Sequence, residues 1–196
     1  NLIMKFIRFF RSTKVTTNPK VCLEVMYDYT HFLFKHKSSF NDFRVIKDTQ
    51  NEQIFYYETK VFNFIPLSPV RRFVSIKKLI PEERKFNQIY LDLQSKKLFY
   101  FKCYMENDGD QVTIYNEIIF KVSKFVYLFK KPLLWIINKK FDVMWNEDKE
   151  MLTQLYHETS YQDLKCVPPS FNLSNFFLRD FDNKFKNIEN DFKIEI

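Results

Sequence analysis

The sequence has almost none of the small residues that allow a backbone to approach a phosphate closely. It contains one glycine, Gly109, and no alanine in 196 residues. Dinucleotide-binding and P-loop motifs need at least two residues without a Cβ beside the phosphates, so both kinds of loop are excluded. We therefore expect no nucleotide cofactor. We expect Gly109 to serve the Asn-Asp-Gly-Asp turn around it, where a positive φ is needed.

Cysteines and long apolar runs are also scarce. The three cysteines, Cys22, Cys103 and Cys166, are odd in number and lack C-x-x-C spacing. This pattern indicates neither a disulfide framework nor a zinc ribbon, and it favours a reducing intracellular compartment. The most apolar stretch, residues 125–137, is interrupted by two lysines and a proline. It falls short of the ~20 apolar residues that a membrane-spanning helix requires.

The chain is basic, with a formal net charge of +7, but it has no block of five or six basic residues. We therefore expect no nucleic-acid partner, and we interpret the basic residues as mostly solvated, with a peripheral membrane contact as the alternative. The basic residues form scattered pairs: Arg71-Arg72, Lys77-Lys78, Lys96-Lys97, Lys130-Lys131 and Lys139-Lys140. Three interpretations of the basic N-terminus stay open: a first strand, an interfacial helix, or a mitochondrial or other organellar import signal.

The pattern along the chain predicts one α+β domain over residues 1–158. Residues 5–16 read as a strand, and Asn18 followed by Pro19 begins a helix that we expect to continue to about Phe34. Short turns separate six further extended segments, as in an antiparallel meander. These segments are 43–48, 53–62, 71–80, 85–94, 97–106 and 111–122. Helical periodicity follows from 123 to about 158, with a predicted interruption at Pro132. Residues 159–196 are a C-terminal extension that wraps the domain or contacts a partner.

This order of elements resembles the START-like superfamily, also called helix-grip or SRPBCC. The resemblance implies a curved antiparallel sheet of about six or seven strands wrapped on a long C-terminal helix. It also implies an apolar cavity for a lipid, polyketide, hormone or aromatic ligand. Architecture alone implies no chemistry, because unrelated functions share folds.

Histidine is rare, and two of the three histidines lie close together in the pattern Asp28-x2-His31-x4-His36. Two imidazoles and one carboxylate on one face of an iron leave positions open for oxygen and substrate. The spacing is similar to the motif of the catalytic domain of Rieske-type aromatic-ring-hydroxylating oxygenases, a branch of the same superfamily. That resemblance implies Fe(II) held by His31, His36 and an aspartate of the C-terminal helix. It also implies that Asp28 is a catalytic acid outside the ligand set.

Asp148 is the candidate for the third ligand. It falls in phase with the apolar stripe of the last helix, between Trp145 and Leu152. A carboxylate that faces a core is costly unless it is paired or binds a metal. Glu147 takes this role if the register is off by one. The sequence has no C-x-H and C-x2-H pair for a Rieske cluster, so a separate protein would have to deliver the electrons.

Three functional hypotheses follow. The first is a mononuclear non-heme iron oxygenase that acts on a hydrophobic cyclic substrate. The second is a binding protein that carries a lipid, quinone or pigment without chemistry, with histidines that are structural or contact the ligand. The third is an accessory subunit of a larger or membrane-bound complex.

Overall fold

The computed structural model describes residues 4–28, 40–60 and 68–154. The strands are β1 (Met4–Thr16), β2 (Phe40–Asp48), β3 (Glu52–Lys60), β4 (Val70–Ile80), β5 (Lys85–Asp92), β6 (Leu98–Asp108) and β7 (Gln111–Ser123). The helices are α1 (Pro19–Tyr27), the short 3-10 helix η2 (Pro81–Glu83), α3 (Lys124–Leu128) and α4 (Lys130–Gln154). Every strand that the sequence predicts is present, with its ends shifted by a few residues.

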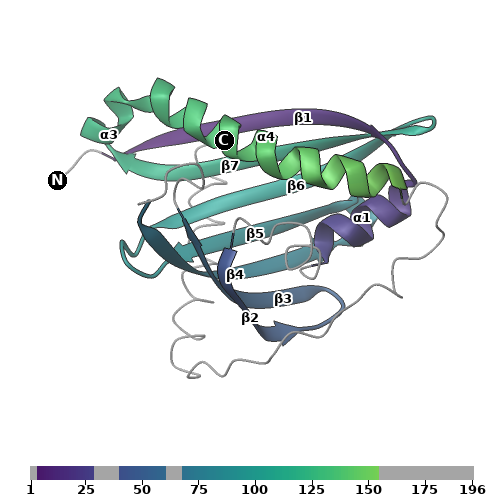
Figure 1. The fold of residues 1–196 in the computed structure, drawn as a ribbon, viewed down its shortest axis with the longest axis horizontal. Helices are drawn as coiled ribbons and strands as arrows, with labels where there is room; N and C mark the ends of the chain where they lie inside the picture. The colour runs from purple at the N-terminus through teal and green to yellow at the C-terminus, as the bar shows by residue number, and fades with distance from the viewer. Residues whose placement is uncertain (1–3, 29–39, 61–67, 155–196) are drawn as a thin grey trace.

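The strands form one antiparallel seven-stranded sheet in the order β1-β7-β6-β5-β4-β3-β2. From β2 to β7 each strand pairs with the next one in the chain, and β1 pairs with β7 along its whole length (Figure 1). Gly109 has a φ of 64° in the turn between β6 and β7, which confirms the predicted positive φ. Short turns of this kind keep consecutive strands adjacent.

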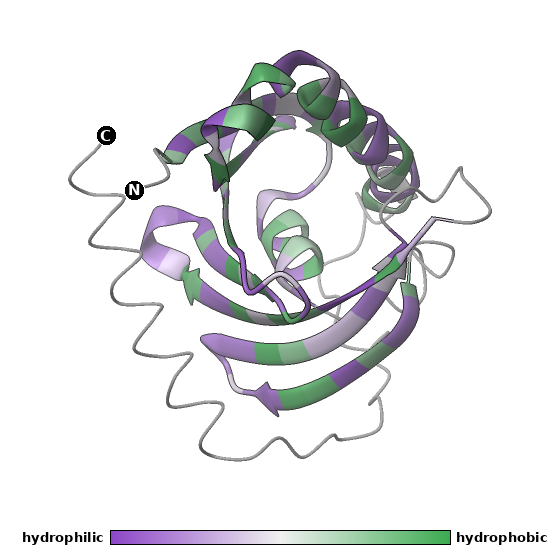
Figure 2. Ribbon diagram, turned by 90° about the vertical axis from the view of Figure 1, so that its left-hand side faces the viewer, coloured by the Kyte–Doolittle hydropathy of each residue, from purple (hydrophilic) through white to green (hydrophobic). Residues whose placement is uncertain are grey.

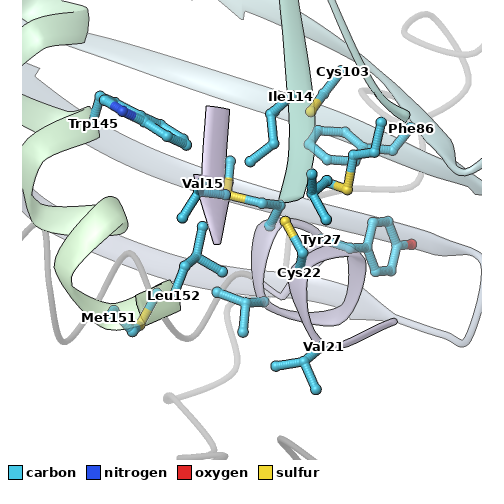
Figure 3. Packing of buried hydrophobic residues seen from close by; sticks show 14 of the residues in the cluster. Val15, Val21, Cys22, Tyr27, Phe86, Cys103, Ile114, Trp145, Met151 and Leu152 are labelled. Carbon is cyan, nitrogen blue, oxygen red and sulfur yellow. The ribbon is translucent and has the colours of Figure 1, made fainter. Parts of the chain in front are cut away.

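The long helix α4 runs across the concave face of the sheet, and α1 lies against the far end of α4 (Figures 1 and 2). One stripe of α4 faces the sheet, with Trp145, Asp148 and Leu152 all buried. The phase predicted for Asp148 is therefore confirmed. Around Leu152, side chains of α1, α4 and the sheet pack into one apolar cluster (Figure 3). This cluster holds α1 and the C-terminal half of α4 against the sheet.

Helix α1 begins as predicted and ends earlier. The Asn18 side chain accepts a hydrogen bond from the Lys20 N–H, and Pro19 occupies the first helical position. The helix ends at Tyr27 and not near Phe34, because Asp28 already has an extended backbone with a ψ of 123°. The expectation that this helix continues to about Phe34 is therefore wrong.

The break in the C-terminal helical segment lies at Phe129 and not at Pro132. Phe129 separates α3 from α4, with φ of −95° and ψ of 22°. Pro132 sits in the first turn of α4, where its missing N–H costs no intrahelical hydrogen bond. The Ser123 side chain accepts a hydrogen bond from the Val126 N–H and so caps the start of α3.

Two expectations about the ends of the chain have different outcomes. Residues 4–16 form β1, so the strand interpretation of the N-terminal segment is confirmed there and the interfacial helix is wrong there. The C-terminal extension, 159–196, lies outside the described residues, so its role stays a prediction. Among the helices that the structure describes, none is long and apolar enough to cross a membrane.

Candidate ligand cavity

A cavity of about 540 Å³ lies between the concave face of the sheet and α4. A volume of this size is typical of sites for small organic ligands. Aromatic side chains are the largest group in its wall: Phe40, Phe43, Phe55, Tyr57, Phe73, Phe86, Tyr90, Phe99, Phe101, Phe120, Phe141 and Trp145. The aliphatic side chains of the wall come mostly from α4. The cavity is therefore apolar over most of its length.

The sheet register places a polar group on the floor of this apolar cavity. Lys77 of β4 pairs with Gln88 of β5, and both side chains point to the concave face. Gln88 is buried, and its Nε2 donates a hydrogen bond of 2.6 Å to the Oγ of the neighbouring buried Ser75. Asn116 of β7 adds a further buried amide to the lining. A ligand that reaches this end would find hydrogen-bonding partners.

Lys77 is fully buried and holds the end of α1. Its Nζ donates to the carbonyl oxygens of Met26 at 2.7 Å and of Tyr27 at 2.6 Å. These carbonyls belong to the last turn of α1, where no intrahelical N–H is left to satisfy them. The same Nζ lies 4.3 Å from the centre of the Phe86 ring. Helix α1 thus ends where the Lys77 side chain donates hydrogen bonds to the last carbonyl groups of the helix.

Burial lowers the pKa of Lys77 from 10.5 to about 7. Burial removes the ammonium from water, and the electrostatic influence of the neighbouring Cys103, Asp28 and Asp148, which acts to raise the pKa, opposes this effect only in part. At neutral pH a substantial fraction of Lys77 is therefore a neutral amine. A neutral amine is a nucleophile and a base, which an ordinary solvated lysine at this pH is not.

The interpretation of the Lys77-Lys78 pair as a solvated strand edge is wrong for Lys77. The signal in the sequence was the alternation Phe73, Ser75, Lys77, which puts all three on one face of β4. The pattern could not be decisive, because Val74 and Ile76 on the opposite face are also buried. A strand with two buried faces gives no alternation of polar and apolar residues to read.

The residues predicted to bind iron are placed only in part. Asp148 is buried in the cavity wall, and Asp28 is buried just after α1; both lie near enough to Lys77 to affect its pKa. His31 and His36 lie outside the described residues. Within the parts of the chain that the structure describes, no three His, Cys, Asp or Glu side chains gather into a metal-binding group. The Fe(II) site of His31, His36 and Asp148 therefore stays a prediction, as does Glu147 as the substitute ligand.

The other end of the cavity carries positive charge. Lys140 of α4 lines it, with its Nζ 3.4 Å from the Thr59 Oγ1 and 3.5 Å from the Lys60 carbonyl. Burial lowers the pKa of Lys140 to about 8. Thr59 pairs with Arg71 in the sheet, so Arg71 lies beside this ammonium group.

Asp92 forms an ion pair with Arg71, with 3.7 Å between the Asp92 Oδ2 and the Arg71 Nη1. Although burial acts to raise it, the pKa of Asp92 is lowered by hydrogen bonds from Ser95 and the Gln94 N–H and by Arg71. Lys97 also lines this end of the cavity. In the sequence, Arg71 and Lys140 give no signal beyond their places in two basic pairs that were interpreted as mostly solvated. This end of the wall is net positive, because the positive charges of Arg71, Lys97 and Lys140 outnumber the single negative charge of Asp92.

No protein-family model matches the chain, and no curated protein matches its sequence. Solved structures do match. Norcoclaurine synthase from Thalictrum flavum, in complex with dopamine and hydroxybenzaldehyde, superimposes with a TM-score of 0.62 and 14% identity over 81% of this chain and 90% of that chain. The Zhui aromatase/cyclase from a Streptomyces species gives a TM-score of 0.55 and 10% identity over 78% of this chain and 93% of that chain.

A protein from Thermus thermophilus adds a third match, with a TM-score of 0.61 and 7% identity over 76% of this chain and 98% of that chain. The chain has the helix-grip fold. The predicted fold class, α+β with a curved antiparallel sheet around a long C-terminal helix, is thereby confirmed. At such low identity the similarity extends to the fold alone, and the specific resemblance to Rieske-type oxygenases gains no support from it.

The buried Lys77 predicts a particular pH dependence of the stability of this helix-grip domain. Its pKa is lower in the folded than in the unfolded chain, so between about pH 7 and 10.5 the unfolded chain binds more protons and stability rises with pH. We expect the free energy of unfolding of the wild type, relative to Lys77→Met, to rise over this range by up to about 1.4 kcal/mol per pH unit. Denaturant unfolding at several pH values measures it. The matched control is Val143→Met at an exposed position, whose difference from the wild type should not depend on pH. A difference between the wild type and Lys77→Met that is also independent of pH would refute the buried amine.

Proposed function

We propose that this protein binds a hydrophobic small molecule in the cavity between the sheet and α4. The observation that carries the proposal is the cavity itself, with its volume of about 540 Å³ and its predominantly aromatic wall. Closely packed interiors rarely leave such a space. An apolar ligand of matching size would restore the contacts that the wall lacks, and its burial would supply the free energy of binding.

Structures with the same fold support this proposal. Norcoclaurine synthase, in the complex that matches this chain, holds dopamine and hydroxybenzaldehyde, and another match is an aromatase/cyclase. Dopamine and hydroxybenzaldehyde are aromatic molecules, and the name aromatase/cyclase refers to the formation of aromatic rings. The wall of the present cavity suits such ligands, because aromatic rings stack or meet edge to face with other rings. Phe43, Phe55 and Tyr57 already make such contacts with one another.

The two polar ends narrow the class of ligand. Lys140 and Asp148 are separated by about two turns of α4, or about 12 Å along its axis. An apolar body of about this length would fill the aromatic middle of the cavity. Its polar group would meet either the net positive end near Lys140 or the hydrogen-bonding end near Lys77. We propose an amphipathic ligand with a ring system or isoprenoid body and an acidic group that faces Lys140.

Catalysis on the ligand is a finer proposal that depends on Lys77. A neutral amine in an apolar cavity can take a proton from the ligand, and its place beside Gln88 puts it at the wall that the ligand contacts. The oxygenase hypothesis, with Fe(II) at His31, His36 and Asp148 and a separate electron donor, is a different chemistry for the same cavity. The carriage of a ligand needs neither, so we propose binding as the primary function.

Blocking the cavity tests the proposal. N-phenyl-1-naphthylamine, a neutral apolar dye that fluoresces in apolar surroundings, serves as the probe. We expect Met144→Trp, which places a large ring in the cavity wall, to weaken dye binding at least tenfold, which equals about 1.4 kcal/mol. Val143→Trp, the exposed neighbour on α4, is the matched control and should bind like the wild type. If the wild type fails to bind the dye, or both variants bind it equally, the cavity is not a binding site.

The charge at the cavity end gives a second prediction. Lys140→Met keeps the length of the side chain and removes its charge. We expect the affinity for an anionic probe, 1-anilinonaphthalene-8-sulfonate, to fall about tenfold, or about 1.4 kcal/mol, while the neutral dye binds as before. Fluorescence titration measures both affinities. Lys149→Met, on an exposed part of the same helix, should change neither; equal losses for both probes in Lys140→Met would contradict an acidic group at this end.

A further inference from the structure

A second surface, outside the cavity, combines exposed apolar and basic side chains. We call it the α3–α4 face; it consists of Lys124, Phe125, Leu128, Phe129, Lys130, Lys131 and Trp135. Phe125 is 70% exposed, Leu128 74% and Trp135 57%. Phe125 and Phe129 contact one another edge to face, with 5.5 Å between their ring centres. Apolar side chains of this size are not usually gathered on the surface of a soluble protein without a partner.

The charge around this face has one sign. Residues 118–141 contain six lysines and no aspartate or glutamate. Lys124, Lys130 and Lys131 have no ion pair within the described residues, and Lys130 lies 5.5 Å above the Tyr127 ring. Aromatic and leucine side chains framed by lysines on a short amphipathic helix are typical of segments that lie in the headgroup region of anionic membranes.

The position of the face connects it with the cavity. The opposite sides of the same helices, with Val126, Leu133 and Ile137, pack in one cluster with Phe99 and Phe120. Four of these five residues also line the cavity, Val126 being the exception. In Figure 2, which looks at the molecule from the end at which α3 lies in Figure 1, the helices form the upper wall and the sheet curves beneath them. One layer of helix therefore separates the α3–α4 face from the cavity.

We infer that the α3–α4 face docks the protein on an anionic membrane surface. Phe125, Leu128 and Trp135 enter the boundary between headgroups and acyl chains, and the lysines contact the lipid phosphates. Docked in this way, the helix layer that forms one wall of the cavity lies against the source of an amphipathic ligand. This part of the inference rests on the proposed function, whereas the docking itself depends only on the surface residues.

Vesicle binding tests the inference with the full chain. Sedimentation compares vesicles of phosphatidylcholine with vesicles that also contain about 30 mol% phosphatidylserine. We expect at least tenfold tighter binding to the anionic vesicles. The double variant Phe125→Asp/Leu128→Asp and the double variant Lys130→Glu/Lys131→Glu should each lose at least tenfold of that affinity. Val143→Asp and Lys149→Glu, exposed positions farther along α4, are the matched controls and should bind like the wild type.

Dye binding in the same variants separates this inference from the proposed function. We expect the surface variants to bind N-phenyl-1-naphthylamine like the wild type, which also shows that they fold. Equal binding of the wild type to neutral and anionic vesicles, or equal losses in the control variants, would overturn the docking. So would a stable oligomer in solution that the surface variants dissociate, because the face would then be a protein interface. A wild type that binds vesicles without binding the dye would overturn the proposed function and leave the docking standing.

Discussion

The contact between Lys77 and the last carbonyls of α1 is the interaction on which the architecture of the cavity depends. Lys77 stands on the floor of the sheet, and its Nζ reaches Met26 and Tyr27 at 2.7 and 2.6 Å. It donates hydrogen bonds to carbonyl groups at the end of α1. Leaving a buried carbonyl without a hydrogen bond commonly costs about 1–3 kcal/mol of stability. It thereby holds α1 against the concave face and forms one of the two polar ends of the cavity.

Many of the aromatic residues of the chain form the wall of this cavity. The sequence has 24 phenylalanines, and many of them line the space between the sheet and α4 or stack along it. Small residues would widen the cavity, and charged ones would need partners there. Large rings leave a cavity of defined size whose wall is apolar, with charge confined to its ends. The same scarcity of small residues that excludes a nucleotide site is compatible with this one.

The sequence predicted the elements well and the polar site poorly. The strands followed from their short polar turns, Gly109 from its turn, and Asp148 from its phase on the last helix. The end of α1 at Tyr27 could not be predicted, because it coincides with a contact from Lys77, which is distant in the chain. The burial of Lys77 was hidden by the apolar residues on both faces of β4. The break at Phe129 was misplaced because Pro132, a stronger local signal, fits within the first turn of a helix.

The central claim is that the cavity holds an apolar organic molecule, and native mass spectrometry of the full chain tests it most directly. The protein is measured as purified and again after incubation with N-phenyl-1-naphthylamine. The account predicts one noncovalently bound organic molecule per chain in at least the second sample, lost in Met144→Trp and kept in Val143→Trp. A spectrum with the bare chain in both samples, or with an iron ion and no organic molecule in either, would contradict it.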